Sequence, residues 1–290
     1  MSVFAYKVFA AIVEEKSFGK AARVMNITPS AISHCISKLE EQLGLTLFTR
    51  DRTGAELTED GKRMLPLMRD VLKSDERLLQ EAALTRGLET GAVCIGMFNS
   101  VCIEYIPELV RTFRARHPNI EINICQGGYD DILGWLRNNV VDMAFASIND
   151  YGDNEAVPLF RDRMMCVTGK EFKPRHPGYV TPEDIRGQKI VYQCDGDNLD
   201  VDACLAEHGI TISSRFSVDS DHAMVTLVEA GLGMCIIPEL VYKPFKGEFS
   251  VYPLEPAVYR TIVLATPKNR PLSAAAREMH EHIIELLKVI

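Results

Sequence analysis

The sequence lacks the patterns that mark membrane proteins and several common enzyme classes. No apolar stretch approaches the roughly 18 residues that a membrane-spanning helix needs, and the N-terminal MSVFAYKVFAAIVEEKSF has neither a basic leader nor a cleavage site. The G-x-S-x-G elbow, the H-E-x-x-H zinc motif and the phosphate-binding loop are also missing. We therefore expect a cytoplasmic protein that is not an enzyme, contacts no membrane and needs no cofactor.

The eight cysteines lack any arrangement that marks a zinc site. They include no C-x-x-C pair and no zinc-ligand spacing, and most of them lie inside apolar, strand-like runs. Such cysteines are typical of buried, reduced thiols in a reducing compartment. We therefore expect no bound metal.

Excess positive charge, the usual sign of a nucleic-acid-binding protein, is missing from the chain as a whole, whose net charge is -8. Residues 1–88, however, hold 13 Lys and Arg and 12 Asp and Glu. The other 202 residues hold 19 Lys and Arg and 28 Asp and Glu. The acidity belongs to the C-terminal portion, so the two portions are expected to face different partners. A length of 290 residues suits one large domain or two to three modest ones.

Two short helical patterns stand almost end to end in FGKAARVMNITPSAISHCISKLEEQLG, residues 18–44. Ser17 is placed to cap the first helix, and Asn26 tolerates the left-handed geometry of a turn. The first helix carries apolar residues at helical spacing, namely Phe18, Ala21, Ala22 and Met25.

The second helix is expected to begin at Thr28, which can cap it, and Pro29, which fits the first helical position. One face of this helix is apolar and consists of Ile32, Cys35, Ile36, Leu39 and Leu43. The other carries short polar side chains, those of Ser30, Ser33, His34 and Ser37. This pattern predicts a helix-turn-helix whose second helix enters a major groove. A merely solvated polar face is the alternative, because many helical hairpins have the same pattern.

Residues 45–58, LTLFTRDRTGAELT, alternate like two short strands around a turn that contains Gly54. Arg50 and Arg52 lie at the tip of this hairpin. A basic hairpin beside a helix-turn-helix indicates a wing whose arginines meet phosphates or a minor groove. Exposed turn arginines are also common without any partner.

From Thr58 the sequence stays helical to about Arg86, with Pro66 near the start and the polar Asp75 within an apolar heptad pattern. The pattern predicts dimer contacts through Leu65, Met68, Leu72 and Leu79. Packing of these residues against their own domain is the alternative.

Beyond the hinge sequence RGLETGA, residues 86–92, strands and helices alternate, which predicts a largely parallel α/β sheet or pair of sheets. The expected strands are 92–97, 120–125, 142–148, 163–168, 189–194, 214–219, 233–237 and 260–266. The expected helices are 103–116, 129–139, 200–208, 221–231 and 272–289.

The whole chain resembles the LysR-type transcriptional regulators. The resemblance is strongest in SFGKAARVMNITPSAISHCISKLEEQLGLTLFTRDRTGAELTEDG, which follows the family pattern of an S/T-x-x-A-x-S helix, L-E-x-x-L-G-x-x-L-F-x-R and L-T-x-x-G. The later AMVTLVEAGLGMCIIPELV also resembles the family's second subdomain. So many fixed spacings in one stretch make the resemblance specific.

The resemblance implies a winged helix-turn-helix at residues 1–58, a dimerising linker helix at 59–88 and an effector domain at 89–290. The effector domain is expected to be α/β and similar to a periplasmic binding protein, with subdomain I at about 91–160 and 267–290 and subdomain II at about 161–266. The chain is expected to cross between them near residues 147–160 and 264–270. The implied partners are double-stranded DNA with an interrupted palindrome, a small-molecule effector, a second copy in a homodimer or dimer of dimers, and RNA polymerase.

The family often has a base-reading glutamine where this chain has Pro29, which has no side-chain donor, so its sequence preference is expected to differ. We expect base contacts from Ser30, Ser33 and His34. We expect phosphate contacts from Thr28, Lys38, Arg50 and Arg52.

In binding-protein folds a ligand lies at the carboxyl ends of the strands, where helices begin. The expected effector contacts follow such strands: Asn99, Ser100, Gly128, Ser147, Asn149, Asp197, Asn198 and His222. Ser100 takes the place of a pocket Ser or Thr in the family, although a helix cap would look identical. The acidic loop CDGDNLDVDAC lacks the glycine and the terminal glutamate of a calcium-binding EF-hand. It makes a purely anionic effector less natural unless Lys or Arg lines the facing wall of the site.

Two other functions stay open. Peroxide sensors of this family use a cysteine pair in the loop that here holds Cys194 and Cys204, but the spacing differs and Asn198 stands near the place of the reacting cysteine. A small-molecule binding or transport protein is the other alternative, and residues 1–58 argue against it.

Overall fold

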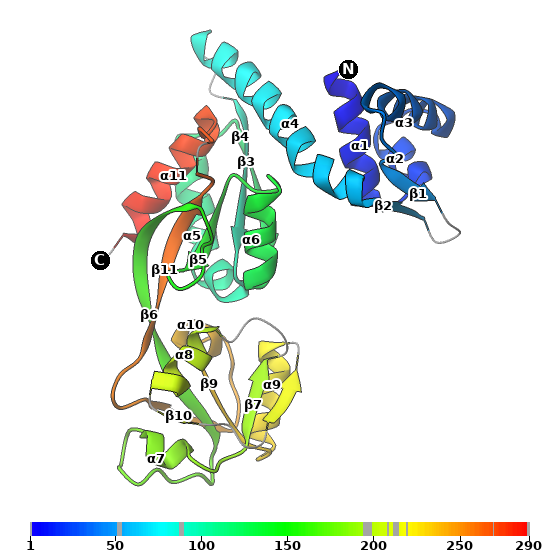
Figure 1. Cartoon of the computed structure of the whole chain (residues 1–290). Coiled ribbons are helices and arrows are strands. Elements are labelled where there is room, and N and C mark those ends of the chain that lie inside the picture. The colour runs from blue at the N-terminus through cyan, green and yellow to red at the C-terminus, as the bar shows by residue number, and fades with distance from the viewer. Residues whose placement is uncertain are drawn as a thin grey trace. The chain divides into compact units, whose positions relative to one another are not determined.

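The computed structural model of the chain describes residues 2–50, 54–86, 90–193, 199–207, 209–210, 215–218, 220–268 and 270–288 (Figure 1). The chain divides into two compact units. The N-terminal unit comprises residues 1–91 with the short segments 137–140 and 271–277, and the second unit comprises the rest.

Four helices and a two-stranded hairpin build the N-terminal unit. They are α1 (Val3–Glu15), α2 (Phe18–Val24), α3 (Pro29–Leu43), β1 (Phe48–Arg50), β2 (Ala55–Leu57) and α4 (Glu59–Thr85). The expected caps are confirmed, because side-chain oxygens of Ser17, Thr28 and Thr58 accept hydrogen bonds from the first turns of α2, α3 and α4. Asn26 has a φ of 54°, the left-handed geometry expected of the turn.

The core of the N-terminal unit joins α1, α2, α3 and the hairpin. Ile32, Ile36 and Leu39 of α3 are at most 1% exposed. They belong to the same hydrophobic cluster as Phe9 and Phe48, whose ring centroids lie 5.1 Å apart. The apolar stripe predicted for the second helix is therefore the stripe that packs inward.

The second unit holds nine strands in one continuous arrangement with helices on its faces. The strands are β3 (Gly91–Met97), β4 (Ile120–Gln126), β5 (Met143–Ser147), β6 (Glu155–Gly169), β7 (Ile190–Gln193), β8 (Arg215–Val218), β9 (Met234–Pro238), β10 (Phe249–Pro253) and β11 (Tyr259–Thr266). The helices are α5 (Asn99–Arg116), α6 (Tyr129–Arg137), α7 (Pro182–Ile185), α8 (Leu199–Glu207), α9 (Asp221–Glu229), α10 (Glu239–Tyr242) and α11 (Ala274–Leu287), whose first turn is assigned to the N-terminal unit. The strand order is β4-β3-β5-β11-β6-β9-β7-β8, with β10 beside β6.

Strand β6 belongs to two lobes of this unit. Residues 155–163 pair antiparallel with β11 in the first lobe, which also contains β3, β4 and β5. From Met164 onward β6 pairs antiparallel with β9 and β10 in the second lobe, which also contains β7 and β8. The outward crossing therefore lies within β6.

Three expectations about this unit need correction. The outward crossing was expected near residues 147–160, but β6 changes from one lobe to the other between Arg163 and Met164. The chain was expected to return to the first lobe near residues 264–270, but β11 already pairs with β5 from Ile262 to Ala265, so the return precedes Tyr259. The sheet was expected to be largely parallel, but β6 and β11 join its neighbours in antiparallel pairs. The sequence pattern missed β10 and the first half of β6.

None of the helices in the described ranges is both long and apolar enough to cross a membrane.

Candidate functional site

Helix α3 presents a polar face to solvent. The side chains of Thr28, Pro29, Ser30, His34 and Lys38 are exposed, and Ser33 is half-buried. These residues lie opposite the buried stripe, so the division between an inner and an outer face that the spacing predicted is confirmed.

The N-terminal part of α3 is suited to approach a polyanion. Residues 28–38 contain no acidic side chain, and Lys38 is their one formally charged group at neutral pH. The positive end of the helix dipole lies at this same end of α3. Lys20 and Arg23 of α2 are also exposed. The sequence reading did not select them, although their spacing of three residues on a short helix places both on one face.

The hairpin β1–β2 forms the expected wing, with Phe48 opposite Leu57 and Arg50 opposite Ala55. The backbone of Arg50 lies in β1, but its side chain and the whole of Arg52 fall outside the described residues. Glu40 of α3 fixes the base of the wing, because its Oε1 accepts hydrogen bonds from the backbone N–H groups of Leu47 at 2.7 Å and Phe48 at 3.3 Å. This contact gives a physical reason for the L-E-x-x-L-G-x-x-L-F spacing.

The close packing of the first turn of α4 against the wing requires a glycine at position 61. A Cβ at that position would lie 2.2 Å from the carbonyl oxygen of Leu47 and 2.8 Å from Cδ2 of Leu57. Thr58 supports the same junction, since its hydroxyl donates to the carbonyl oxygen of Thr46 at 2.6 Å. The L-T-x-x-G motif is thus a packing motif.

Two of the residues expected at a dimer interface face their own unit. Met68 is only 5% exposed and lies in the core cluster, and Leu65 packs against that cluster. Leu72 is half-buried, whereas Leu79 is 61% exposed. Because α4 packs along α1, the face of α4 that holds Leu65 and Met68 is not available to a second copy.

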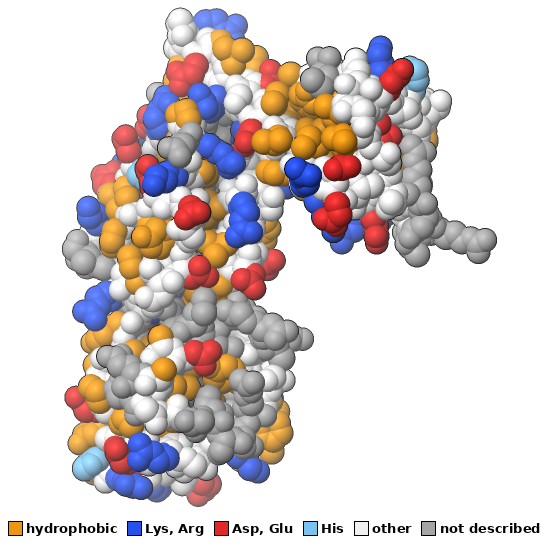
Figure 2. Space-filling model, in the orientation of Figure 1, with side chains coloured by type: hydrophobic (Ala, Val, Ile, Leu, Met, Phe, Trp, Pro, Cys, Tyr) orange, Lys and Arg blue, Asp and Glu red, His pale blue; other side chains and the backbone are white. Residues whose placement is uncertain are grey.

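A different stripe of α4 is exposed. Leu67, Val71 and Leu78 are 55%, 42% and 68% exposed, and their spacing of four and seven residues places them on one face. Figure 2 shows hydrophobic side chains gathered on the visible face of the N-terminal unit. Large apolar side chains exposed at helical spacing usually mark a contact surface.

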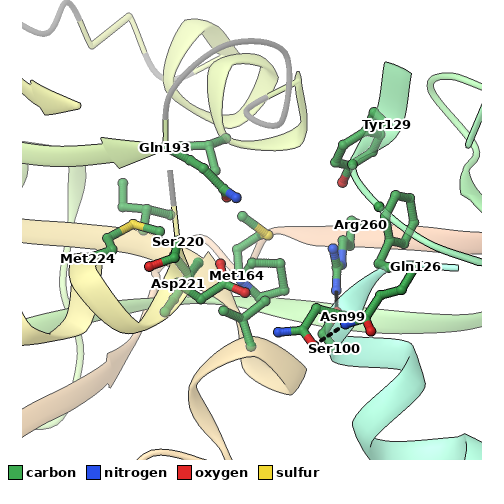
Figure 3. A pocket seen from close by; sticks show the side chains of 18 residues that line it. Asn99, Ser100, Gln126, Tyr129, Met164, Gln193, Ser220, Asp221, Met224 and Arg260 are labelled. Atoms are coloured by element: carbon green, nitrogen blue, oxygen red, sulfur yellow. Dashed lines mark hydrogen bonds between the residues drawn. The ribbon is translucent and has the colours of Figure 1, made fainter. Parts of the chain in front are cut away.

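The second unit contains a cavity of about 350 Å³ at the junction of its two lobes. Its polar lining consists of Asn99, Ser100, Gln126, Tyr129, Gln193, Ser220, Asp221 and Arg260. Its larger apolar side chains include Phe98, Met164, Met224, Ile236 and Ile237. Figure 3 shows the residues of α5, β4 and α6 on one side and Gln193, Ser220, Asp221 and Met224 on the other.

A buried ion pair lies at the base of the cavity. Arg260 of β11 and Asp162 of β6 stand opposite each other in the sheet, and Asp162 also accepts from the backbone N–H of Leu240 in the second lobe. Burial raises the pKa of the Asp162 carboxyl, and the neighbouring Arg260 guanidinium opposes that rise. Burial also lowers the pKa of Arg260, but Tyr129 and Asp162 more than offset this effect. The positive charge in the cavity wall is therefore already compensated.

Ser100 lines the cavity, as expected, and is 4% exposed. Its Oγ accepts a hydrogen bond from Arg260 Nη2 at 3.0 Å. A hydroxyl can accept and donate at the same time, so Ser100 can still donate to a ligand. Asn99 also lines the cavity, and its Oδ1 accepts from Nε2 of Gln126.

Gly128 lines the cavity, but its backbone N–H already donates to Asp131 Oδ2 at 3.3 Å. At Gly127 a Cβ would lie 2.6 Å from Cη2 of Trp135. The two glycines therefore serve the packing of α6 against β4 and leave less free backbone for a ligand than the sequence reading expected.

Three expected effector contacts are not among the residues that line the cavity. Ser147 is fully buried, and its Oγ accepts from the backbone N–H of Asn149 in the turn that leads into β6. Asn149 is exposed in that turn. His222 is exposed and packs its ring against Phe245, with centroids 5.6 Å apart, while its neighbour Asp221 lines the cavity. In this last case the loop that the strand-end rule selected lines the cavity through Asp221 and not through His222.

Asp197 and Asn198 lie outside the described residues, as does Cys194. The backbone of Cys204 belongs to α8, but its side chain is likewise outside them. The expected effector contacts at Asp197 and Asn198 and the cysteine-based alternative stay predictions.

Most of the polar lining was not predicted from the sequence. Gln126 and Gln193 are the last residues of β4 and β7, and Ser220 and Asp221 come soon after β8. A complete application of the strand-end rule would therefore have found all four. Arg260 could not be found in this way, because it lies at the amino end of an antiparallel strand.

Two family models match the chain. The one described as LysR substrate binding domain matches residues 86–288, and the one described as Bacterial regulatory helix-turn-helix protein, lysR family, matches residues 5–62. The chain is 30% identical to the uncharacterized HTH-type transcriptional regulator YvbU of Bacillus subtilis, over 99% of each protein.

Solved structures show the same fold. A variant of full-length OxyR from Pseudomonas aeruginosa has a TM-score of 0.78 at 18% identity, with 98% of this chain and 94% of that one covered. The effector binding domain of QuiR, solved in complex with shikimate, has a TM-score of 0.61 at 25% identity, with 69% of this chain and 98% of that one covered.

Proposed function

Because the chain belongs to the LysR family of transcriptional regulators, we propose that it binds double-stranded DNA through the outer face of α3 and that a small molecule in the cavity of the second unit modulates this binding. The chain is a transcriptional regulator with a helix-turn-helix and an effector-binding domain. The proposal concerns which residues do this work. It includes action on RNA polymerase at the bound DNA and no enzymatic step.

The observation that carries the DNA-binding part is the exposed N-terminal part of the outer face of α3, where residues 28–38 include no acidic side chain. Ser30 and His34 stand one turn apart on this face and offer hydrogen-bond donors and acceptors to base edges in the major groove. Ser33 lies beside them. Thr28 and Lys38, at the two ends of the same face, are suited to phosphates, together with Lys20 and Arg23 of α2.

Affinity from a single N-terminal unit should be low. Residues 1–88 carry a net charge of only +1, and the phosphate contacts of one unit are few. We infer that two or more copies bind successive half-sites of an interrupted palindrome, because linked binding events multiply affinity. The exposed stripe of Leu67, Val71 and Leu78 is the surface we assign to contacts between copies, with Leu79 at its edge.

The test uses a DNA duplex from upstream of the chain's own gene and a random duplex of equal length. We expect tighter binding to the upstream duplex and, for Lys38→Ala, a log-log salt slope that is smaller by about one per bound chain, since one phosphate contact is lost. Lys246→Ala is the matched control, because Lys246 is exposed in the second unit. The assignment of the outer face of α3 to DNA would be contradicted if Lys38→Ala and Lys246→Ala had equal salt slopes and the protein did not prefer the upstream duplex.

The cavity points to a small, compact effector. A volume of about 350 Å³ lies near the lower end of the range for ligand pockets. Its polar groups fit hydroxyl or amide groups of a ligand, and its methionine and isoleucine side chains fit an apolar face. Since Asp162 compensates Arg260 while Asp221 adds negative charge, we propose a neutral or zwitterionic molecule, or one with a single negative charge, over a multiply charged anion.

Calorimetric titration of a panel of small metabolites tests this charge argument. Shikimate, the ligand in the QuiR structure, is a natural first member of the panel. For any compound that binds, Asp221→Asn should raise the affinity of anionic compounds and lower that of compounds with an amino group. His222→Gln, which alters the next residue on α9 outside the cavity, should leave both unchanged. An identical response of the two variants would remove Asp221 from the site.

A further inference from the structure

Two cysteines of the first lobe hold their sulfur atoms in contact. Cys94 of β3 and Cys125 of β4 lie on neighbouring strands, and their Sγ atoms are 3.6 Å apart. A disulfide has a sulfur separation of about 2.05 Å and spans Cα separations of about 4.4–6.8 Å, which includes the spacing of about 4.8 Å between neighbouring strands. Only a small movement separates this contact from a bond.

We propose that Cys94 and Cys125 form a dithiol site that a hydroperoxide oxidises reversibly to a disulfide within one chain. The site is distinct from Cys194 and Cys204 and does not depend on the proposed function. It lies in a part of the sheet to which no role has been given above.

Solvent access favours this pair over the two buried cysteines, Cys166 and Cys235. Cys94 and Cys125 are both half-buried, so a small oxidant can reach them from solvent. Cys166 and Cys235 are fully buried, and burial raises the pKa of the Cys166 thiol to about 12 and that of Cys235 well above its ordinary value. Thiols with such pKa values supply little of the thiolate that reacts.

The oxidation balances with a hydroperoxide as the named oxidant. One cysteine thiolate attacks a peroxide oxygen and the O–O bond breaks. The cysteine becomes a sulfenic acid, and the leaving oxygen takes up a proton to form water or an alcohol. The second thiol then attacks the sulfenic sulfur, the S–S bond forms, and the hydroxyl group leaves as water with the thiol proton. The two sulfurs lose two electrons together, and a dithiol reductant restores both thiols by exchange.

The movement should fall on β4. The backbone of Cys94 is held by Asp142, whose carboxylate accepts from the Cys94 N–H at 2.8 Å and whose own N–H donates to the Cys94 carbonyl at 2.8 Å. Among the described residues, strand β4 is at the edge of the sheet and pairs with β3 alone. Cys125 directly precedes Gln126, which lines the cavity, so oxidation would shift one wall of the cavity.

Peptide mapping of the full-length chain tests the proposal. The reduced protein is treated with hydrogen peroxide, remaining thiols are alkylated, and the protein is cleaved with trypsin without reductant. Cys94 falls in the peptide 87–111 and Cys125 in 117–137. We expect these two peptides joined, at a mass about 2 Da below their sum because two hydrogens are lost, and separated again by dithiothreitol.

Three variants identify the atoms that react, since peptide 87–111 also contains Cys102. The joined peptides should persist in Cys102→Ser and disappear in Cys94→Ser and Cys125→Ser. Alkylation of both Cys94 and Cys125 in the peroxide-treated wild-type chain would overturn the proposal. So would a link that survives in Cys94→Ser, or one that non-reducing electrophoresis traces to two chains. Peptide 190–215 reports Cys194 and Cys204 separately in the same digest.

Discussion

Arg260 donates two hydrogen bonds to a single oxygen of Asp162, from Nη2 at 2.8 Å and from Nε at 3.0 Å, and both residues are 4% exposed. The pair lies where β6 and β11 continue from one lobe toward the other. Arg260 also donates a hydrogen bond to Ser100 at the N-terminus of α5, and Asp162 accepts one from the backbone N–H of Leu240 at the N-terminus of α10. The two charges therefore connect the lobes beneath the cavity of the second unit.

Removing one member of this pair should be costly. We expect Arg260→Met to lower the free energy of unfolding by about 3–5 kcal/mol, because it leaves the Asp162 carboxylate buried without its cation. The double variant with Asp162→Leu should recover much of that loss, since no charge stays buried. Urea unfolding measures both. The exposed pair Arg116 and Glu285 provides the control, and Arg116→Ala should leave the urea midpoint almost unchanged because solvent screens this pair. Similar losses for Arg260→Met and Arg116→Ala would show that the buried pair is not structural.

The two stripes of α4 should respond differently to substitution. Leu78→Glu places a charge on the exposed stripe, so we expect it to dissociate the oligomer while the unfolding midpoint of the chain falls little. Met68→Ala removes a buried side chain, so we expect a loss of about 2–5 kcal/mol with the oligomer retained at concentrations where the chain is folded. Sedimentation velocity and urea unfolding separate the two effects. A dimer that persists in Leu78→Glu would place the interface elsewhere.

Two glycine-to-alanine substitutions should change the free energy of unfolding in opposite directions. Gly61→Ala should destabilise the chain by about 1–3 kcal/mol, because its Cβ would overlap the Leu47 carbonyl oxygen. Gly134→Ala, inside α6, meets nothing within 4 Å and should stabilise the chain by about 0.4–1 kcal/mol by restricting the unfolded state. Thermal unfolding of both variants tests this, with a lower unfolding temperature expected for Gly61→Ala and a higher one for Gly134→Ala. A neutral Gly61→Ala would mean that α4 can move away from the wing at no cost.

His282 should make stability depend on pH. It is 5% exposed and shares a hydrogen bond with Thr112, at 2.8 Å between Nε2 and Oγ1. Burial, reinforced by the Arg116 charge, lowers the pKa of His282 below its ordinary value near 6.5. The unfolded chain then binds the proton more readily, so the contribution is complete above about pH 6.5 and is lost as the pH falls toward the folded-state pKa.

The measurement is the free energy of unfolding between pH 7.5 and pH 5. His282→Gln should flatten the decline at the acidic end, and the exposed His222→Gln should leave the slope as in the wild type. Equal slopes in all three proteins would show that His282 charges without penalty in the folded state.

Local patterns predicted the helix-turn-helix closely because the signals are local. Ser17, Thr28 and Thr58 cap helices whose first turns follow at once, and Asn26 adopts its left-handed geometry within a single turn. The division of α3 into inner and outer faces follows from a period of 3.6 residues alone.

The same pattern could not decide which apolar stripe of α4 is exposed. Both stripes repeat at helical spacing, and the position of α1 determines that Met68 is buried while Leu78 is not. In the second unit, the strand-end rule found Asn99 and Ser100 because helix α5 begins directly after β3. It failed at Ser147, since β5 is followed by a tight turn into β6 and no helix begins there.

The amino-acid sequence by itself determined where α2, α3 and α4 begin, the polar face of α3 and the alternation of strands with helices, because each depends on residues that are near one another in the chain. Only the tertiary structure decided that Arg260 would meet Asp162 and Ser100, and that Cys94 would contact Cys125. Arg260 meets Asp162 because β11 pairs antiparallel with β6, and Cys94 meets Cys125 because β3 and β4 are neighbours in the sheet. No local period encodes that choice, since it depends on how the whole unit buries its apolar surface.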